Sequence, residues 1–339
     1  MVRPALRFAP YEESAEGPNV VVDGAPNAGT VLVVSHWPGL PMPPDCAADT
    51  SAQMVFRYLD RGADLHHGAE VVTNNHFDQD GLAGVYALVC PDDAVRRRTQ
   101  LEGLAYAGDF AVASDRDSAR LSMAVAALSD PTRSPLSRLP DDYEEACAVL
   151  YHEALALLPD WLEDADSCRA LWAEEDTALD ADFRSLASGS VSIEEDAQLD
   201  LAIVTLPHSG RSAGHRFAGR TFSGIHPIAL HQATERTTIL MIDPSEGRHH
   251  LTCRYEGWVQ FRSRPIRPRV DLRPLSDQLS AAETDGARWT ATPPSDITPE
   301  LYTVADSAPS SLDPTGLIDA VTGHLRDAGS AWDPYTVHH

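Results

Sequence analysis

Lysine is absent from this 339-residue sequence, so its 26 basic residues other than histidine are all arginines. This absence excludes a lysine nucleophile and a Schiff base. Acidic residues number 51, and the formal net charge is −25. Because non-specific affinity for nucleic acid comes mostly from basic side chains that neutralise phosphates, we expect no extended nucleic-acid partner. The arginine-only, alanine-rich composition is typical of a bacterial protein from a GC-rich genome.

Cysteines and long apolar runs are also scarce. The sequence has no window of about 18 uninterrupted apolar residues and no apolar signal-peptide core near its start. We therefore expect a cytoplasmic protein without a membrane partner. A GxSxG motif is missing too, which argues against a serine hydrolase. The five cysteines are scattered, with no CxxC pair, and indicate neither a disulfide framework nor a thiolate zinc site: Cys46, Cys90, Cys147, Cys168 and Cys253.

Strand and helix signals alternate over the first 130 residues. The apolar runs at 31–36 and 71–75 predict strands that lie side by side in a sheet, and this alternation indicates a parallel sheet. Asp49 is a plausible N-cap for the first helix, and Gly108 a plausible end for the last. The expected helices cover residues 52–59, 82–89 and 91–108.

The rest of the chain has a different character. Three prolines at 131–140 mark a boundary, and helical spacing then extends to Pro159 and through a second helix to residue 187. Mixed strand and helix signals follow. We therefore predict an α/β protein with a parallel-sheet domain (1–130), a proline linker with an acidic helical connector (131–189) and a smaller mixed α+β domain (190–339).

The motif HFDQDG follows the second of these strands. Ligands of parallel sheets bind beyond the carboxyl ends of the strands, and both strands deliver a histidine there, His36 and His76. Alternation along HFDQDG could direct His76, Asp78 and Asp80 to one side. One imidazole and two carboxylates suit a divalent cation such as manganese, magnesium or iron(II). We predict His76, Asp78 and Asp80 as catalytic metal ligands.

A plainer interpretation is that Asp78 and Asp80 cap the helix after them and that His76 is a core histidine. Three observations favour the metal. His36 ends the neighbouring strand, Asn74 and Asn75 could support the ligands, and Asp109 follows a helix at a place where a strand-end ligand could lie. We therefore add His36 and Asp109 to the predicted ligands.

The strand followed by NNHFDQDG resembles the first motif of the DHH phosphoesterase superfamily, in which a histidine and two aspartates help to bind two manganese ions. The resemblance implies that His76, Asp78 and Asp80 are ligands and that Asp109 matches the aspartate of the second motif. It covers about the first 130 residues and implies a smaller second domain that closes over the substrate. The motifs SHWPG and HFDxDG are also similar to those of an uncharacterised bacterial family, and this second resemblance gives no information about activity.

The sequence departs from the superfamily in one respect. No strand ends in Asp-His-His, and the nearest match, DLHHG at 64–68, comes before the first motif. The third motif is therefore missing, reshaped or replaced by His36.

Basic residues gather in the second half of the chain, at 208–231 and around Arg254. Arginine forks suit phosphate or carboxylate groups, so these residues predict binding of a small anionic substrate; pairing with the acidic helices is the alternative. The predicted substrate ligands are Arg254, Arg220, His215 and His226.

These features predict a metal-dependent hydrolase of the phosphoesterase kind that activates water at a His/Asp centre. The cofactor would be a divalent metal, with manganese expected and iron or magnesium as alternatives. Two other functions stay open: a mononuclear non-haem iron enzyme, or a non-catalytic ligand-binding descendant of the DHH fold. A homodimer is compatible with the sequence.

Overall fold

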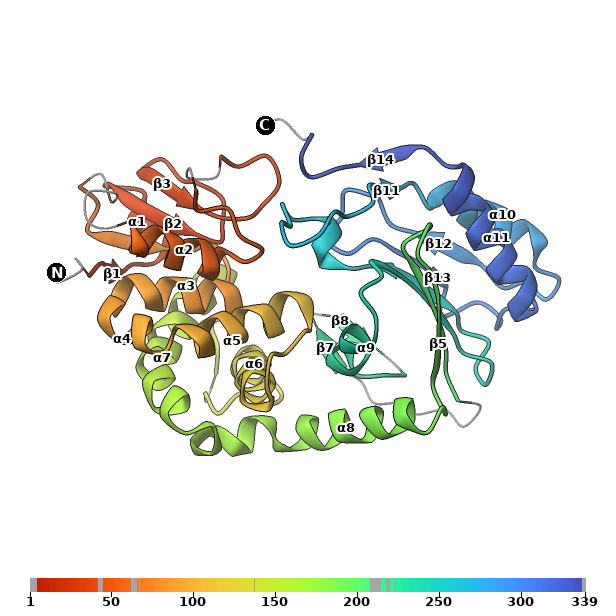
Figure 1. Ribbon diagram of the computed structural model, residues 1–339, viewed down its shortest axis with the longest axis horizontal. Coiled ribbons are helices and arrows are strands. Elements are labelled where there is room, and N and C mark those ends of the chain that lie inside the picture. Colours follow the sequence, from red (N-terminus) through yellow and green to blue (C-terminus); the bar gives the residue numbers. More distant parts are fainter. Residues whose placement is uncertain are drawn as a thin grey trace. The chain divides into compact units, whose positions relative to one another are not determined.

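The computed structural model describes residues 5–41, 45–61, 66, 68–136, 138–207, 215–217, 220–222 and 224–336. The fold class is α/β, as predicted, with a parallel four-stranded sheet and a mixed six-stranded sheet (Figure 1). The chain forms two compact units. Unit 1 comprises residues 1–178 together with 261–263, and unit 2 comprises 179–260 and 264–338. Among the described residues, no helix is long and apolar enough to cross a membrane.

The sheet of unit 1 has the order β1-β4-β2-β3, and all its strands are parallel. The expected adjacency of the strands before His36 and His76 is wrong, because β2 pairs with both β3 and β4 and lies between them. Val20, Val21 and Val22 of β2 are fully buried, as expected for a central strand of a parallel sheet. The strands are β1 (Arg7–Phe8), β2 (Asn19–Val22), β3 (Thr30–Val34) and β4 (Val71–Thr73).

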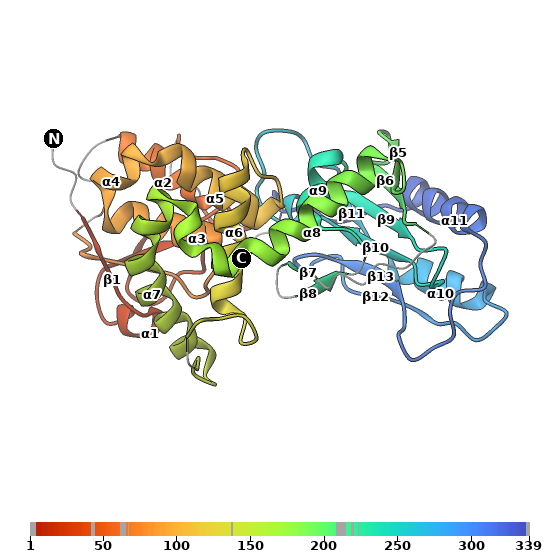
Figure 2. The ribbon, with the colours of Figure 1, turned by 90° about the horizontal axis from the view of Figure 1, so that it is seen from below.

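Helices α2 and α3 pack on this sheet: α2 contacts β2 and β3, and α3 contacts β1, β2 and β4. Helix α5 packs on both helices, and α6 packs on α5 (Figure 2). The helices are α1 (Tyr11–Ser14), α2 (Ser51–Asp60), α3 (Gln79–Val89), α4 (Pro91–Arg96), α5 (Arg98–Phe110), α6 (Arg116–Ser129), α7 (Tyr143–Glu163) and α8 (Arg169–Ala187), with a 3₁₀ turn at Ala165–Cys168.

Three expected helix boundaries are wrong. Thr50, not Asp49, is the N-cap of α2, because its side chain forms a capping box with Gln53. Helix α5 continues past Gly108, so Asp109 lies in its last turn and follows no strand. A Cβ at Gly108 would lie 2.4 Å from Cβ of Gln79, so close packing requires this glycine. Helix α7 continues through Pro159 because the residues after it are packed in the core.

The sheet of unit 2 has the order β12-β13-β10-β9-β6-β5, with β6 and β9 parallel and the other pairs antiparallel. Leucines of β6, β9, β10 and β13 form one apolar cluster with residues of α10 and α11. The elements are β5 (Ser192–Asp196), β6 (Leu201–Thr205), β7 (His215–Phe217), β8 (Arg220–Phe222), α9 (Pro227–Ala233), β9 (Thr238–Ile242), β10 (His250–Cys253), β11 (Arg269–Val270), α10 (Arg273–Ala282), β12 (Trp289–Ala291), β13 (Glu300–Thr303), α11 (Pro314–Asp327) and β14 (Ser330–Trp332), with a 3₁₀ turn at Tyr255–Gly257.

Candidate metal centre

Three neighbouring strands of unit 1 end in polar residues at the same edge of the sheet. Asp23 follows β2, His36 follows β3 by two residues, and the HFDQDG motif begins three residues after β4. Because β2 is the middle strand, Asp23 lies between the two histidines. Asp23 has a φ of 53°, a left-handed conformation that aspartate tolerates better than most residues. The strand order thus places a carboxylate where two imidazoles meet.

His36 lies in a group of carboxylates that is closed to solvent. Its Nε2 atom is 3.3 Å from Oδ1 of Asp23 and 3.5 Å from Oδ2 of Asp109. Oδ2 of Asp80 is 3.8 Å from the same nitrogen. The side chains of His36 and Asp80 are 0 % exposed, so bulk water does not solvate this group.

His76 lies in a second group that is partly open. Its Nε2 atom is 3.3 Å from Oδ2 of Asp23 and 3.1 Å from Oδ2 of Asp78. The side chains of His76 and Asp78 are 21 % and 30 % exposed. The two oxygens of Asp23 therefore face two different histidines, and this carboxylate is shared by both groups.

The ring of His36 is oriented by a backbone carbonyl. Its Nδ1 atom is 2.5 Å from the carbonyl oxygen of Asp49, which can only accept a hydrogen bond. Nδ1 therefore carries a proton, and Nε2 is the nitrogen that faces the carboxylates. Nε2 donates to Asp23 when it is protonated and would offer its lone pair to a metal. A histidine that ligates a metal is commonly held in this way.

Backbone and hydroxyl groups at the start of α2 fix two of the carboxylates. The N–H groups of Ser51 and Ala52 donate to the two oxygens of Asp80, each over 2.7 Å. The Ser51 hydroxyl donates to Oδ1 of Asp23 over 2.8 Å. The N-terminus of α2 thus orients ligands that come from two other segments.

The capping interpretation of the motif holds for Asp78 without excluding a metal. Oδ1 of Asp78 accepts the N–H of Gly81 over 2.8 Å and caps α3, whereas Oδ2 faces His76. Asp80 does not cap its own helix, because its oxygens bind the start of α2. Each carboxylate therefore has a structural contact and also faces a histidine.

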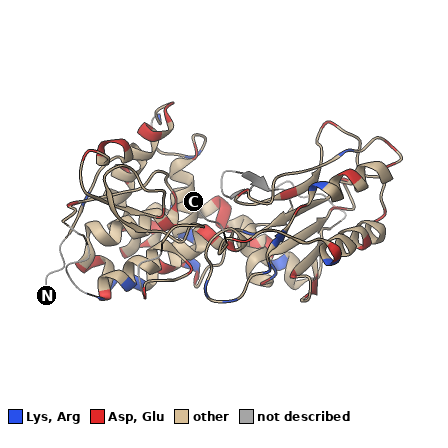
Figure 3. Cartoon of the chain, turned by 90° about the horizontal axis from the view of Figure 1, so that it is seen from above, with Lys and Arg blue, Asp and Glu red and all other residues tan. Residues whose placement is uncertain are grey.

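The crowded carboxylates attract positive charge. Acidic side chains occur throughout both units (Figure 3), but here Asp23, Asp80 and Asp109 are buried. In the described part of the chain, neither these three nor Asp78 forms an ion pair with an arginine. Burial and the neighbouring Asp23 raise the pKa of Asp80 to about 7. Burial, Asp80 and Asp78 raise the pKa of Asp109 well above its usual range.

The remaining pKa shifts have the same origin. Burial alone would raise the pKa of Asp23, but hydrogen bonds to His36 and His76 lower it. Burial opposes protonation of His36, yet its hydrogen bond to Asp23 raises its pKa. Protons and metal cations compete for such groups, so the centre favours either form of positive charge.

The geometry fits divalent cations. Asp23, His36 and Asp80 each offer a ligand atom within 4.8 Å of the others, and so do Asp23, His76 and Asp78. Separations of 3.1–3.8 Å between facing atoms suit ligands about 2.0–2.2 Å from a shared ion. Oδ2 of Asp109 is buried and accepts no hydrogen bond from the described residues, so it is available as a further ligand. The structure thus contains an Asp/His cluster able to bind divalent metal.

Sequence reasoning missed Asp23 and the contribution of Asp49. Asp23 carries the same signal as the two histidines, because it ends the apolar run NVVVD before a glycine. Asp49 has no local signal: its contacts with His36 and with residues 262 and 263 exist only in the folded chain. Asp64–Gly68, the nearest match to Asp-His-His, lies largely outside the described residues.

The predicted substrate ligands lie in the second half of the chain. Arg254 is buried in unit 2, where it pairs with Oε1 of Glu256 over 2.5 Å and donates to the carbonyl of Thr234. His226 caps α9 by accepting the N–H of Ile228 over 3.1 Å. The strands that contain His215 and Arg220 pair as an antiparallel hairpin, but their side chains lie outside the described residues. Substrate binding by these four residues stays a prediction.

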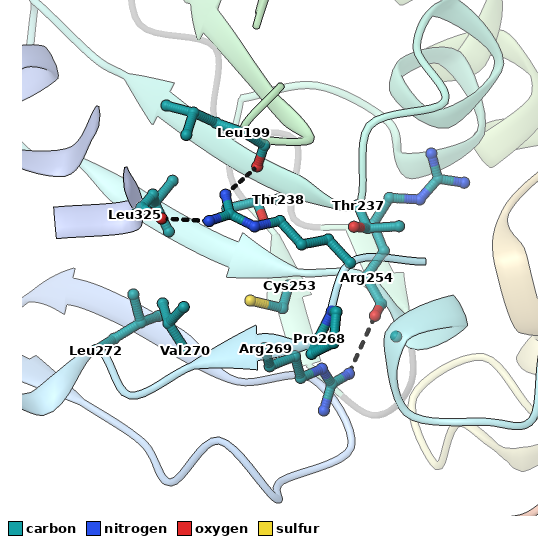
Figure 4. A pocket seen from close by; sticks show the side chains of 12 residues that line it. Leu199, Thr237, Thr238, Cys253, Arg254, Pro268, Arg269, Val270, Leu272 and Leu325 are labelled. Atoms are coloured by element: carbon teal, nitrogen blue, oxygen red, sulfur yellow. Dashed lines mark hydrogen bonds between the residues drawn. The ribbon is translucent and has the colours of Figure 1, made fainter. Parts of the chain in front are cut away.

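A small cavity in unit 2 is lined by three arginines, Arg254, Arg267 and Arg269, and each of their guanidinium groups binds at least one backbone carbonyl (Figure 4). Arg267 donates to the carbonyls of Leu199 and Leu325. Arg269 donates to four carbonyls, among them that of Arg254. Because the Nη groups of Arg267 and Arg269 bind backbone carbonyls, we assign this cavity a structural role.

Gly81 packs closely against Asn74, which holds the backbone of His76, and against Tyr151. A Cβ there would lie 2.2 Å from Nδ2 of Asn74 and 2.6 Å from the hydroxyl of Tyr151. Asn74 cannot yield freely, because its Oδ1 accepts the N–H of His76. Tyr151 is fully buried between the rings of Phe8 and Phe77.

We therefore expect Gly81→Ala to lower the free energy of unfolding by about 1–3 kcal/mol, as overpacking does. Gly323→Ala is the matched control: it is a glycine of α11 at which an added Cβ would meet nothing within 4 Å, so alanine should stabilise the helix by up to about 1 kcal/mol. Urea unfolding of both variants measures the difference. A stabilised Gly81→Ala protein would contradict the expectation.

The fold and the site together define an α/β protein with an Asp/His cluster, able to bind a divalent metal, at the carboxyl edge of a parallel sheet. The chain belongs to the family described as Family of unknown function (DUF6687), whose model matches residues 4–336. A search of curated proteins found no match. Among solved structures, the chain resembles the pGpG-specific phosphodiesterase PggH from Vibrio cholerae, with 12% sequence identity and a TM-score of 0.39, over 95% of this chain and 90% of that one.

Proposed function

We propose that the protein is a cytoplasmic, metal-dependent hydrolase that cleaves a phosphoester of a small anionic substrate with two divalent cations, with manganese the expected metal. One observation carries the proposal: the two oxygens of Asp23 face His36 and His76 respectively. A single cation would need only one of these groups. Two overlapping groups with a shared carboxylate are the arrangement expected for a pair of ions.

The proposed ligands form two groups, one on a side closed to solvent and one on a partly exposed side. His36, Asp80 and Asp109 would hold one cation where water is excluded, with Asp23 as the shared ligand. His76 and Asp78 would hold the other at the partly exposed side, where a substrate can approach. When bound, such cations lower the pKa of a water and neutralise charge on the phosphoryl oxygens.

The motif supports assignment to the DHH phosphoesterase type. His76, Asp78 and Asp80 correspond to the first motif of that superfamily, and Asp109 to the aspartate of the second. We propose that His36 supplies the histidine that the absent Asp-His-His motif would have provided. Carboxylates alone would repel a phosphoester, so the cations are also required to attract the substrate.

Metal analysis of protein purified without chelator tests this function. We expect two manganese ions per chain and hydrolysis of a chromogenic phosphodiester that depends on them. His76→Gln should lower the count to one, whereas His152→Gln, an exposed histidine on α7, should leave it at two. One iron per chain would favour the mononuclear enzyme instead, and no metal would favour a non-catalytic descendant.

A further inference from the structure

A short segment from far along the chain belongs to unit 1. Residues 261–263 group with it, although their chain neighbours on both sides belong to unit 2. The carboxylate of Asp49 holds this segment: Oδ1 accepts the N–H groups of Arg262 over 2.7 Å and Ser263 over 2.8 Å. Oδ2 accepts the Ser263 hydroxyl. Asp49 is only 4% exposed, so these bonds are sheltered from water.

The same Asp49 holds a candidate metal ligand with its backbone. Its carbonyl accepts Nδ1–H of His36, and the next residues continue the pattern, because Ser51 and Ala52 donate to Asp80. Residues 49–52 therefore orient the candidate ligands through backbone groups. The side chain of Asp49, in contrast, contacts residues 262 and 263.

The segment also contacts the region of Asp109. The ring of Phe261 lies edge-on to that of Phe110, with centroids 5.2 Å apart. Phe110 follows Asp109 directly in the last turn of α5, and its centroid is 6.4 Å from that of His36. Phe261 and Phe110 are both buried, so this contact constrains the end of α5.

We propose that residues 261–263 form a strap that positions the ligands of the closed side, with Asp49 as the positioning residue that links it to His36. This inference rests on the metal centre proposed above. Docking of the strap fixes the carbonyl that orients His36, so it raises the affinity for the cation. Linkage is reciprocal, so cation binding must stabilise the docked strap by the same factor.

The test uses Mn²⁺ and the full-length chain. Asp49→Ala removes the carboxylate that holds the strap but keeps the backbone carbonyl, and we expect it to weaken Mn²⁺ binding about tenfold or more, as loss of an outer partner of a ligand does. Ser263→Ala, a milder change, should weaken binding in the same direction, and Ser263→Thr should restore it. In the parent protein, Mn²⁺ should slow hydrogen exchange at the amides of Arg262 and Ser263.

Asp115→Ala is the matched control. Asp115 also accepts a backbone N–H and hydroxyl groups, but those of Ser114 and Ser118 at the start of α6, so its loss should lower stability and leave Mn²⁺ affinity unchanged. Parent-like affinity in both Asp49→Ala and Ser263→Ala would overturn the strap and leave the metal centre standing. Hydrogen exchange at residues 262 and 263 that does not change on addition of Mn²⁺ would also overturn the strap. Failure of the parent itself to bind would overturn both proposals.

Discussion

Replacing Asp23 by asparagine is expected to weaken metal binding at both histidines at once and to abolish hydrolysis. Asparagine keeps the size of the side chain and tolerates the left-handed φ of 53° at this position. It offers one oxygen instead of two and no charge, so it cannot serve both groups. Loss of an outer partner of a ligand costs about 10–100-fold in affinity, and loss of a shared ligand should cost at least about 100-fold.

Asp200→Asn is the control for this variant. Asp200 also has a left-handed φ, 51°, and its carboxylate is bound by Thr237 in unit 2. The measurement is Mn²⁺ titration by calorimetry, with metal counted after desalting. We expect Asp200→Asn to retain two ions and Asp23→Asn none. Retention of both ions with the affinity of the parent in Asp23→Asn would show that Asp23 is not shared.

Metal removal is expected to destabilise the protein strongly. Without cations, Asp23, Asp80 and Asp109 remain close together and buried, so they must either repel one another or take up protons, and both reduce the free energy of unfolding. Ligand linkage adds about 2.7 kcal/mol of stability for each site when free metal is at 100 times its Kd, or about 5 kcal/mol for two sites. For a unit of 150–250 residues this corresponds to a rise of roughly 10–20 °C in Tm.

Thermal unfolding with chelator and with excess Mn²⁺ measures this effect. Asp23→Asn serves as the internal control, since a protein that has lost both ions should unfold at the same temperature in either condition. An unchanged Tm of the parent across a wide range of Mn²⁺ concentrations would contradict the metal centre. A rise of only about half the expected size would indicate one occupied site.

Part of the site could be predicted because its signals are local. An apolar run before HFDQDG indicates a strand that ends in polar residues, and the same pattern marks His36. Those residues needed no knowledge of distant contacts. The alternation of strands and helices likewise predicted the α/β class, since periodicity within a segment depends on which of its faces is buried.

The arrangement of those segments depends on pairing between distant residues. Nothing near β2 specifies that it pairs with both β3 and β4, yet this order makes Asp23 the middle ligand. The sequence places Asp109 just beyond a helix end, but in the fold it lies within α5, where Gly108 packs closely on Gln79.

The sequence by itself therefore determined the secondary-structure class, the excess of acidic charge and the motif that carries His76, Asp78 and Asp80, because these follow from composition and from neighbours along the chain. Only the tertiary structure decided that Asp23 faces two histidines and that Asp49 joins His36 to a segment more than 200 residues away. Such contacts arise from the packing of whole elements, whose free energy is summed over the fold and has no signature in any short stretch.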